Sequence, residues 1–274
     1  MIVRVPATSA NLGPGFDVMG LALSLYAEVG IVGVDNAPDG AHEAEDTHPA
    51  QVAFIRAGGR GRVWVKNSIP MGRGMGFSGA VRVGGIVAAE VQRDGALWNR
   101  ATSSALAIGT ELEGHADNVA PSLFGGVVIA SGDLVVPVPM ALNPVFVMWV
   151  PDFTTSTNES RGKIGPTINL SDAVFNIART AMFVTALQTG DISILREATQ
   201  DRIHQQIRLA ASPPCAAALA AGLDAGAWCG WLSGSGPTVA LMCDPAQADT
   251  VAAALPADGH AKLLTLDTAG AVVL

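Results

Sequence analysis

Apolar positions along the chain follow two periods, and each period predicts one kind of element. Between 171 and 189, residues such as Val174, Ile177 and Ala181 recur at helical spacing behind Ser171, a residue type that caps helices. Further helices are predicted at 49–57, from the glycines near 76 to about 93, and at 102–113, 192–208 and 246–255. Short apolar or alternating runs predict strands at 2–6, 62–66, 127–130, 145–150, 228–232, 239–243 and 262–266, and another apolar run covers 18–25.

A change in composition divides this pattern into two halves. Three prolines, Pro137, Pro139 and Pro144, stand close together between 133 and 144. A chain of 274 residues is long enough for about two domains. We therefore predict an α+β protein with domains at 1–138 and 139–274, the second built as a strand-and-helix sandwich.

Charge and cysteine content exclude several classes of partner. The net charge is -8 and the chain has only three lysines, which disfavours nucleic acid or an anionic membrane as a partner. Three cysteines without a C-x-x-C pair predict neither a disulfide framework nor a zinc site. We expect a cytoplasmic protein that binds a small molecule.

The stretch 70–80 concentrates glycines directly before a predicted helix. It reads Pro-Met-Gly-Arg-Gly-Met-Gly-Phe-Ser-Gly-Ala, and its glycines allow a positive φ and a close approach to a ligand. The free N–H groups and the dipole at the start of the following helix suit a phosphate. No Lys-Ser/Thr follows the glycines, and their spacing differs from the dinucleotide fingerprint. Taken alone, the stretch also fits an ordinary glycine-rich loop.

Polar residues gather in two other places beside predicted core segments. Residues 7–17 and 114–122 are rich in Ser, Asn, Asp and His, and a second glycine-rich turn covers 233–238. By contrast, the acidic region 34–46 has few large apolar residues and predicts a solvated surface loop.

Four stretches together resemble the GHMP small-molecule kinases. They are Pro6-x-x-Ser9-x-Asn11-Leu12-Gly13-Pro14-Gly15-Phe16-Asp17, the loop 70–80, Gly114-His115-x-Asp117-Asn118-Val119-Ala120-Pro121 and Leu232-Ser233-Gly234-Ser235-Gly236-Pro237-Thr238. The first and third resemble the homoserine kinases in particular, as do 170–181 and 201–204. The resemblance covers most of the chain and is weakest from 31 to 61.

The resemblance implies ATP-dependent, Mg²⁺-assisted phosphorylation of the side-chain hydroxyl of L-homoserine, a step toward threonine. It also implies an N-terminal half like ribosomal protein S5 domain 2, a ferredoxin-like C-terminal half, an active site between them, and a homodimer.

The resemblance assigns roles to individual residues. ATP would be bound by Pro70, Gly72, Arg73, Gly74, Met75, Gly76, Phe77 and Ser78, and Mg²⁺ by Ser78 and Glu113, with Glu111 as the alternative. Arg161 and Arg208 would bind the substrate carboxylate. Asn11, His115 and Asp117 would hold the rest of the substrate, while Asp17, Asn118 and Thr157 would lie near the reacting hydroxyl. Whether a general base takes part stays open.

Several structural alternatives stay open at this point. Asn11 and Asp17 can serve turn backbone, His115 can bond locally, Arg208 can pair with Asp201 on one helix face, and Glu113 can be a solvated helix-end residue. His204 and Arg202 also lie in a family-like segment but are secondary candidates.

The loop also departs from its relatives. Most GHMP kinases carry Gly-Leu-Gly-Ser-Ser-Ala-Ala, whereas this chain has Met75, Phe77 and Gly79 at three of those positions. The rival functions are a kinase for another hydroxy acid, such as L-threonine, and a catalytically silent protein that binds an amino acid or a nucleotide.

Overall fold

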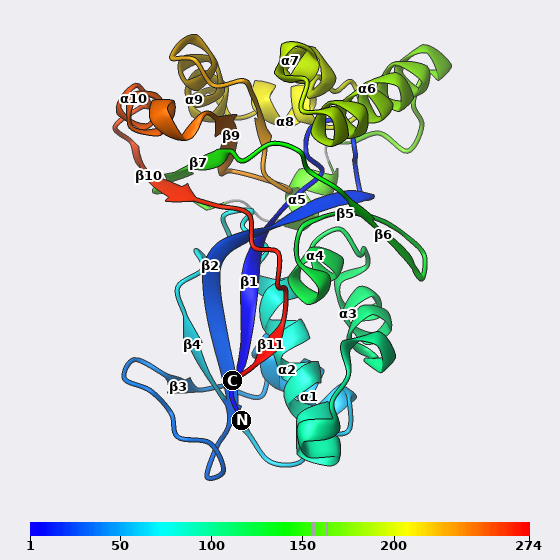
Figure 1. Ribbon diagram of the computed structural model, residues 1–274, viewed down its shortest axis with the longest axis vertical. Coiled ribbons are helices and arrows are strands. Elements are labelled where there is room, and N and C mark those ends of the chain that lie inside the picture. Colours follow the sequence, from blue (N-terminus) through cyan, green and yellow to red (C-terminus); the bar gives the residue numbers. More distant parts are fainter. Residues whose placement is uncertain (155–156, 163) are drawn as a thin grey trace.

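The computed structural model describes residues 1–154, 157–162 and 164–274, without the side chains of Ala96, Thr157, Asn158 and Glu159. Figure 1 shows two halves stacked along the long axis, with most N-terminal elements in blue to green below and most C-terminal elements in green to red above, while the red C-terminal strand returns to the lower half. Both halves mix helices and antiparallel strands, so the α+β prediction is confirmed.

The lower half is built on one antiparallel sheet covered by helices. Its strands are β1 (Val3–Ala10), β2 (Met19–Ile31), β3 (His42–Glu43), β4 (Val63–Asn67), β5 (Val127–Ser131), β6 (Leu134–Val138) and β11 (Val272–Val273). The order is β11-β1-β2-β4-β3, and β5 pairs with both β2 and β6. The helices are α1 (Pro49–Arg56), α2 (Phe77–Asp94), α3 (Ala105–Glu113) and α4 (Val119–Phe124). The small residues along α2 allow it to lie centrally against the sheet, where a Cβ at Gly84 would come within 2.6 Å of Val29.

The upper half has a four-stranded antiparallel sheet of order β10-β7-β9-β8. These strands are β7 (Val145–Pro151), β8 (Cys229–Leu232), β9 (Val239–Cys243) and β10 (Gly259–Leu264). The helices are α5 (Thr157–Gly162), α6 (Leu170–Thr189), α7 (Leu195–Ala198), α8 (Gln205–Ala210), α9 (Pro213–Asp224) and α10 (Ala248–Ala253). This strand order, with helices between the first and second and the third and fourth strands, is that of the expected ferredoxin-like half.

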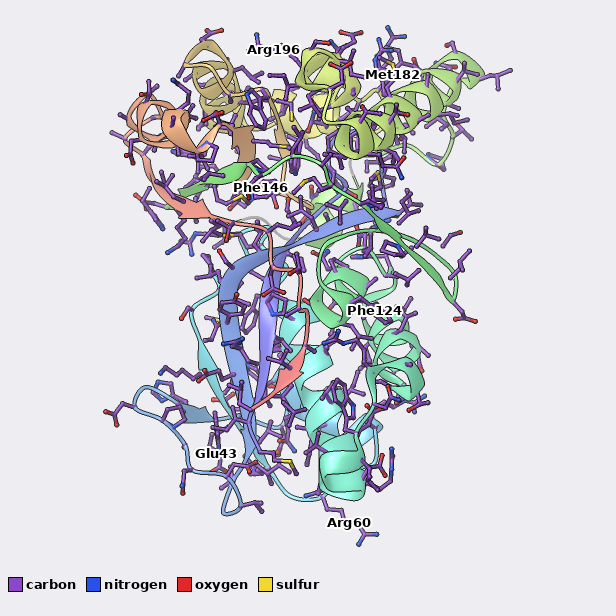
Figure 2. All side chains as sticks on the ribbon, viewed as in Figure 1. Glu43, Arg60, Phe124, Phe146, Met182 and Arg196 are labelled. Atoms are coloured by element: carbon purple, nitrogen blue, oxygen red, sulfur yellow. The ribbon has the colours of Figure 1, made fainter. Side chains whose placement is uncertain are left out.

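One hydrophobic core runs through both halves. Trp231 on β8 packs edge-on against Phe146 and Phe183, and its indole N–H donates to Ser9 of β1 at 2.9 Å. Figure 2 labels Phe146 at the level where the upper half meets β2. The junction between the halves is therefore packed, and the two sides of a site placed there have fixed relative positions.

Most predicted elements are found within a few residues of their expected ends. The helix predicted at 192–208 is wrong. A 3₁₀ turn at Ile192–Ile194 and α7 are separated from α8 by a turn, because the Asp201 carboxylate accepts N–H groups of Ile203, His204 and Gln205. Helix α9 was not predicted, since its alanine-rich sequence has no clear apolar period.

The division at 138 and 139 falls between β6, the last strand of the lower sheet before the crossing, and β7, the first of the upper sheet. The end of the chain then returns to the lower sheet, where β11 pairs with β1. The proposed domain boundary stays a prediction.

Candidate active site

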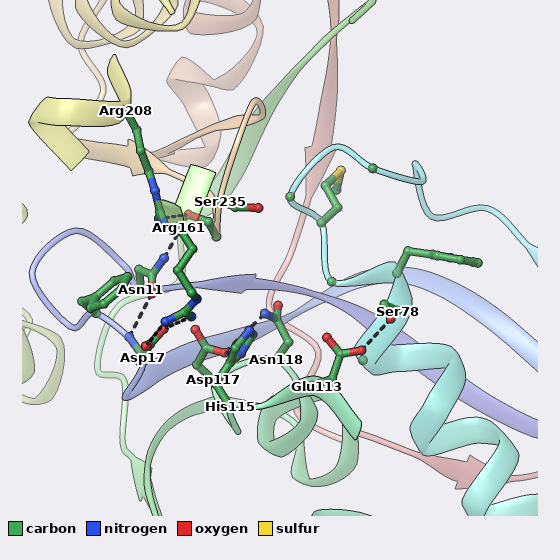
Figure 3. A pocket seen from close by; sticks show the side chains of 18 of the residues that line it. Asn11, Asp17, Ser78, Glu113, His115, Asp117, Asn118, Arg161, Arg208 and Ser235 are labelled. Atoms are coloured by element: carbon green, nitrogen blue, oxygen red, sulfur yellow. Dashed lines mark hydrogen bonds and ion pairs between the residues drawn. The ribbon is translucent and has the colours of Figure 1, made fainter. Parts of the chain in front are cut away.

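A cleft lies at the junction of the two halves. Figure 3 shows its polar side chains in three groups: Arg161, Arg208 and Asp17 on the left, His115, Asp117 and Asn118 in the middle, and Glu113 and Ser78 on the right beside α2. The remaining lining residues are Asn11, Phe16, Pro70, Gly72, Gly74, Met75, Gly76, Phe77, Gly79, Gly234 and Ser235. The four resembling stretches therefore meet in one place.

The glycine loop forms the wall of the cleft at the start of α2. Gly74 and Gly76 have φ values of 71° and 67°, which L side chains rarely adopt. A Cβ at Gly74 would lie 2.3 Å from the carbonyl oxygen of Ser233, and one at Gly76 would overlap Thr8. The loop is thus pressed between the second glycine-rich turn and β1, and α2 begins at Phe77 as expected for a phosphate-binding helix N-terminus.

Ser78 and Glu113 meet on the right side of the cleft. The Ser78 hydroxyl donates to Oε1 of Glu113 at 2.5 Å, and Arg82, one turn further along α2, forms an ion pair with the same oxygen. Within the described residues, Oε2 of Glu113 accepts no hydrogen bond. The alternative ligand Glu111 instead pairs with Arg56 at 2.8 Å, where both side chains are about half exposed and outside the cleft.

This donor set fits Mg²⁺. The ion prefers hard oxygen ligands and takes one or two from protein, with the rest from phosphate and water. A hydroxyl and a carboxylate side by side at a phosphate-binding helix N-terminus meet that requirement, with Oε2 available toward the cleft.

The turn after β1 has an unusual backbone. Asn11, Leu12 and Asp17 are non-glycine residues with φ values of 70°, 48° and 60°. The Asn11 side chain accepts the N–H of Asp17 at 3.0 Å and donates to the Gly234 carbonyl at 2.9 Å. Asn11 therefore hydrogen-bonds the backbone of the turn and also lines the cleft, so a structural role and a role in substrate binding are compatible.

Asp17 and Arg161 bind each other across the cleft. Two parallel hydrogen bonds of 2.7 Å join the guanidinium of Arg161, on α5, to both carboxylate oxygens. This contact holds the pKa of Arg161 above its ordinary value. A group predicted to bind the substrate carboxylate is thus paired with a carboxylate of the chain itself.

Arg208 is buried, and among the described residues its hydrogen-bond partners are neutral. Its side chain donates to the Gly234 carbonyl at 3.0 Å and contacts Nδ1 of His204 at 3.1 Å, while its Nε has no partner in the described part of the chain. Burial, with the charge of Arg161 as a further cause, lowers the pKa of Arg208. The alternative pairing of Arg208 with Asp201 is not found, because Asp201 accepts from Asn176 and from backbone N–H groups.

His204 connects Arg208 to the turn after β1. Its Nε2 lies 2.8 Å from the carbonyl oxygen of Gly13, and the ring is fully buried. Burial lowers the pKa of His204, so the imidazole is neutral, donates to Gly13 and accepts from Arg208. His204 thus connects Gly13 to Arg208 and does not itself line the cleft.

Hydrogen bonds fix the middle group, one within the group and one to β1. Nδ1 of His115 lies 2.5 Å from Oδ1 of the buried Asp117, and this hydrogen bond is the main reason that the pKa of His115 is raised. Thr8 donates to the Asn118 side-chain oxygen at 2.6 Å. His115 thus bonds locally, as the structural alternative supposed, and still faces the cleft with Asp117 and Asn118.

Two predicted residues, Arg73 and Thr157, are placed differently or left aside. Arg73 does not line the cleft, because its guanidinium donates to the carbonyls of Pro151 and Asp152 in the upper half. Thr157 begins α5, but its side chain lies outside the described ones. Phe77 lines the cleft and a neighbouring cavity, and stacks edge-on against His48.

Sequence reasoning missed one lining residue with many contacts, Phe16. Its ring stacks on His204 and lies beneath both Arg161 and Arg208. Its place next to Asp17 in the first motif was the available signal.

Comparisons with known proteins agree with this geometry. Residues 46–126 match the N-terminal domain of the GHMP kinases, and residues 183–261 match their C-terminal domain. Homoserine kinase from Moorella thermoacetica is 41% identical over 88% of this chain and 87% of its own. Homoserine kinase from Thermus thermophilus is 38% identical over 92% and 90%.

A solved structure extends the similarity to three dimensions. Homoserine kinase from Cytophaga hutchinsonii, at 27% identity, superposes with a TM-score of 0.85 over 100% of this chain and 97% of that chain. The expected two-domain GHMP kinase fold is confirmed. The chain belongs to the GHMP kinases and, within them, to the homoserine kinase family.

Proposed function

We propose that this protein transfers the γ-phosphoryl group of ATP to the side-chain hydroxyl of L-homoserine. The order of groups in the cleft supports this assignment, since two arginines stand at one end and the phosphate-binding loop at the other (Figure 3). An amino acid bound by its carboxylate on the left would direct its hydroxyl past Asp117 and Asn118 toward a phosphate at α2.

Arg208 is the observation that supports an anionic acceptor most strongly. It is 5% exposed, and among the described residues it forms no ion pair. Asp17, Asp201 and Asp117 act on this charge only from beyond ion-pair distance. A buried charge without a directly bound counter-ion is costly, so the guanidinium favours binding of an anion from outside the chain. The carboxylate of homoserine supplies one.

The nucleotide would occupy the right side of the cleft. Free N–H groups at the start of α2 and the glycine loop would bind its phosphates. We propose that the base extends past Phe77 into the neighbouring cavity, whose lining includes Val65 and Met71. Phe77 then contributes an apolar wall where other GHMP kinases have a serine.

The chemistry asks mainly for positioning and charge neutralisation. Ser78 and Glu113 would hold Mg²⁺, which when bound neutralises charge on the phosphates. Asn118, fixed by Thr8, would orient the acceptor hydroxyl, and Asp17 would receive its proton late in the reaction. His115 and Asp117 would hold the amino group side of the substrate.

Measuring ADP release tests the proposal directly. Purified protein with Mg²⁺ and ATP is offered L-homoserine, L-threonine, L-serine or D-pantoate. We expect the highest kcat/KM with L-homoserine. Preference for L-threonine would favour the rival kinase, and binding without turnover of any acceptor would favour the silent homologue.

Two expectations about partners and location stay predictions. They are the homodimer, which light scattering on the purified protein tests, and the cytoplasmic location. Among the described residues, no helix is long and apolar enough to cross a membrane.

A further inference from the structure

We propose that Phe16 is a positioning residue that makes the site selective for acceptors carrying a carboxylate, by holding the guanidinium groups of Arg161 and Arg208 against one aromatic ring at the acceptor end of the cleft. The inference rests on the proposed function, because it assigns the left end of the cleft to the acceptor.

The ring of Phe16 contacts three groups that belong to the acceptor end. The guanidinium carbon of Arg161 lies 5.4 Å from the ring centroid, and that of Arg208 lies 5.5 Å from it. The imidazole of His204 stacks on the ring with a centroid separation of 4.9 Å and an angle of 26° between the planes. Phe16 therefore lies against both arginines, and it also lines the cleft.

Two guanidinium groups at one site repel each other unless something holds them in place. The charge of Arg161 contributes to the lowered pKa of Arg208, which shows that the two cations interact. An aromatic face attracts each cation through its quadrupole and keeps them from separating into solvent. The carboxylate of Asp17, bound to Arg161, offsets part of the repulsion from the other side.

An aromatic hydrocarbon suits this position better than a polar side chain. Phe16 has no hydrogen-bond acceptor, so it orients the arginines without engaging their N–H groups; those of Arg161 that bind Asp17 would be shared with an incoming carboxylate. Its other neighbour, His204, is neutral and already bonded to Gly13 and Arg208, so it adds no third charge. The ring of Phe16 therefore orients the two arginines without accepting any of their hydrogen bonds.

The backbone fixes where the ring stands. Phe16 lies between Gly15, where a Cβ would come within 2.5 Å of Met19, and Asp17, whose backbone is left-handed and bonded to Asn11. The N–H of Gly15 also donates to the Asn11 carbonyl at 2.9 Å. A ring carried by this tight turn has little freedom to follow a displaced arginine.

The test compares Phe16→Leu with a matched control elsewhere in the chain. Phe175 on α6 also has two arginines over its ring, Arg179 at 4.2 Å and Arg202 at 3.9 Å, but it does not line the cleft. Phe175→Leu thus removes the same kind of contact from a place without substrate. Both variants and the wild type are assayed with L-homoserine and with L-homoserinamide, whose amide has no charge. Binding of each compound is also measured by calorimetry.

In Phe16→Leu we expect the KM for homoserine to rise about tenfold, with the KM for ATP unchanged. The ratio of kcat/KM values between homoserine and homoserinamide should fall by a similar factor of about ten, because the amide gains little from the arginines. Phe16→Tyr, which keeps the ring, should restore most of that ratio, and Phe175→Leu should leave it unchanged.

An unchanged ratio in Phe16→Leu overturns the inference, as does an equal loss for both acceptors or an equal rise in the KM for ATP. If Phe16→Leu does not fold, Phe16→Met fills the space without an aromatic face and is read by the same criteria. Absence of turnover by the wild type would refute the proposed function alone, since calorimetry still decides whether Phe16 favours the carboxylate ligand. Absence of homoserine binding to the wild type would overturn both.

Discussion

Asp17 and Arg161 form a bidentate ion pair across the cleft, and both N–O distances are 2.7 Å. The pair joins the turn after β1 to α5, and so links the lower half to the upper half at the acceptor end. An acceptor carboxylate that binds Arg161 must share it with Asp17 or displace it. Substrate binding and the position of the proposed proton acceptor are therefore coupled.

Asp17→Asn separates these two roles of Asp17. The amide cannot accept a proton at neutral pH, and it holds Arg161 less tightly. We expect kcat to fall about a hundredfold, the usual scale for general acid–base catalysis, while the KM for homoserine does not rise. Asp172→Asn is a control, since Asp172 faces Arg202 at 3.7 Å outside the cleft. A kcat within about twofold of the wild type would limit Asp17 to the ion pair.

Arg208→Met tests the buried cation at the acceptor end. The substitution keeps apolar volume and removes the proposed partner of the substrate carboxylate. We expect the KM for homoserine to rise about a hundredfold with little change in the KM for ATP, as measured by steady-state kinetics. Arg202→Met is the matched control on the same segment, because its side chain is 46% exposed and does not line the cleft. An unaltered KM for homoserine in Arg208→Met would remove Arg208 from substrate binding.

Glu113→Gln tests the proposed Mg²⁺ site. The amide is a weaker ligand than the carboxylate, so the Mg²⁺ concentration for half-maximal activity should rise about tenfold. Glu111→Gln provides the control, since Glu111 pairs with Arg56 on the surface. Equal Mg²⁺ requirements in the two variants would place the metal elsewhere.

His115 gives the site a pH-dependent contribution to stability. Its hydrogen bond to Asp117 raises the pKa of His115, so the folded state holds the proton more tightly than the unfolded state. The pair therefore stabilises the fold fully below about pH 6.5, and this contribution is lost as the pH rises through the raised pKa. Denaturant unfolding of the wild type and His115→Gln should differ more at pH 6 than at pH 9. A difference that stays constant or grows with pH would show that the pair is not charged.

The local sequence was sufficient to predict helices, strands and turns wherever a segment's own residues determine its conformation. The glycines before α2 predicted both the turn and the helix start, and their φ values and close contacts explain why glycine is required. Patterned runs located β7 and β9, and the order of the upper sheet followed from the family resemblance.

Contacts between segments far apart in the chain could not be predicted from the local sequence. The Asp201 carboxylate accepts the backbone N–H groups of the turn just before α8, so a stretch that was interpreted as a single helix is interrupted there. Arg73 looked like part of the phosphate loop, but carbonyls of the upper half hold its side chain. The roles of Phe16 and His204 depend on residues nearly two hundred positions away, which no local pattern reveals.

Transfer of the γ-phosphoryl group from ATP to the hydroxyl of homoserine can be observed directly by ³¹P nuclear magnetic resonance of the complete reaction. Protein, Mg²⁺, ATP and L-homoserine should produce a new phosphomonoester resonance together with an equal amount of ADP. The signal should be absent when homoserine is omitted and should shrink in Arg208→Met at low homoserine concentration. Release of ADP with inorganic phosphate alone, or no change in ATP while homoserine binds, would contradict the account.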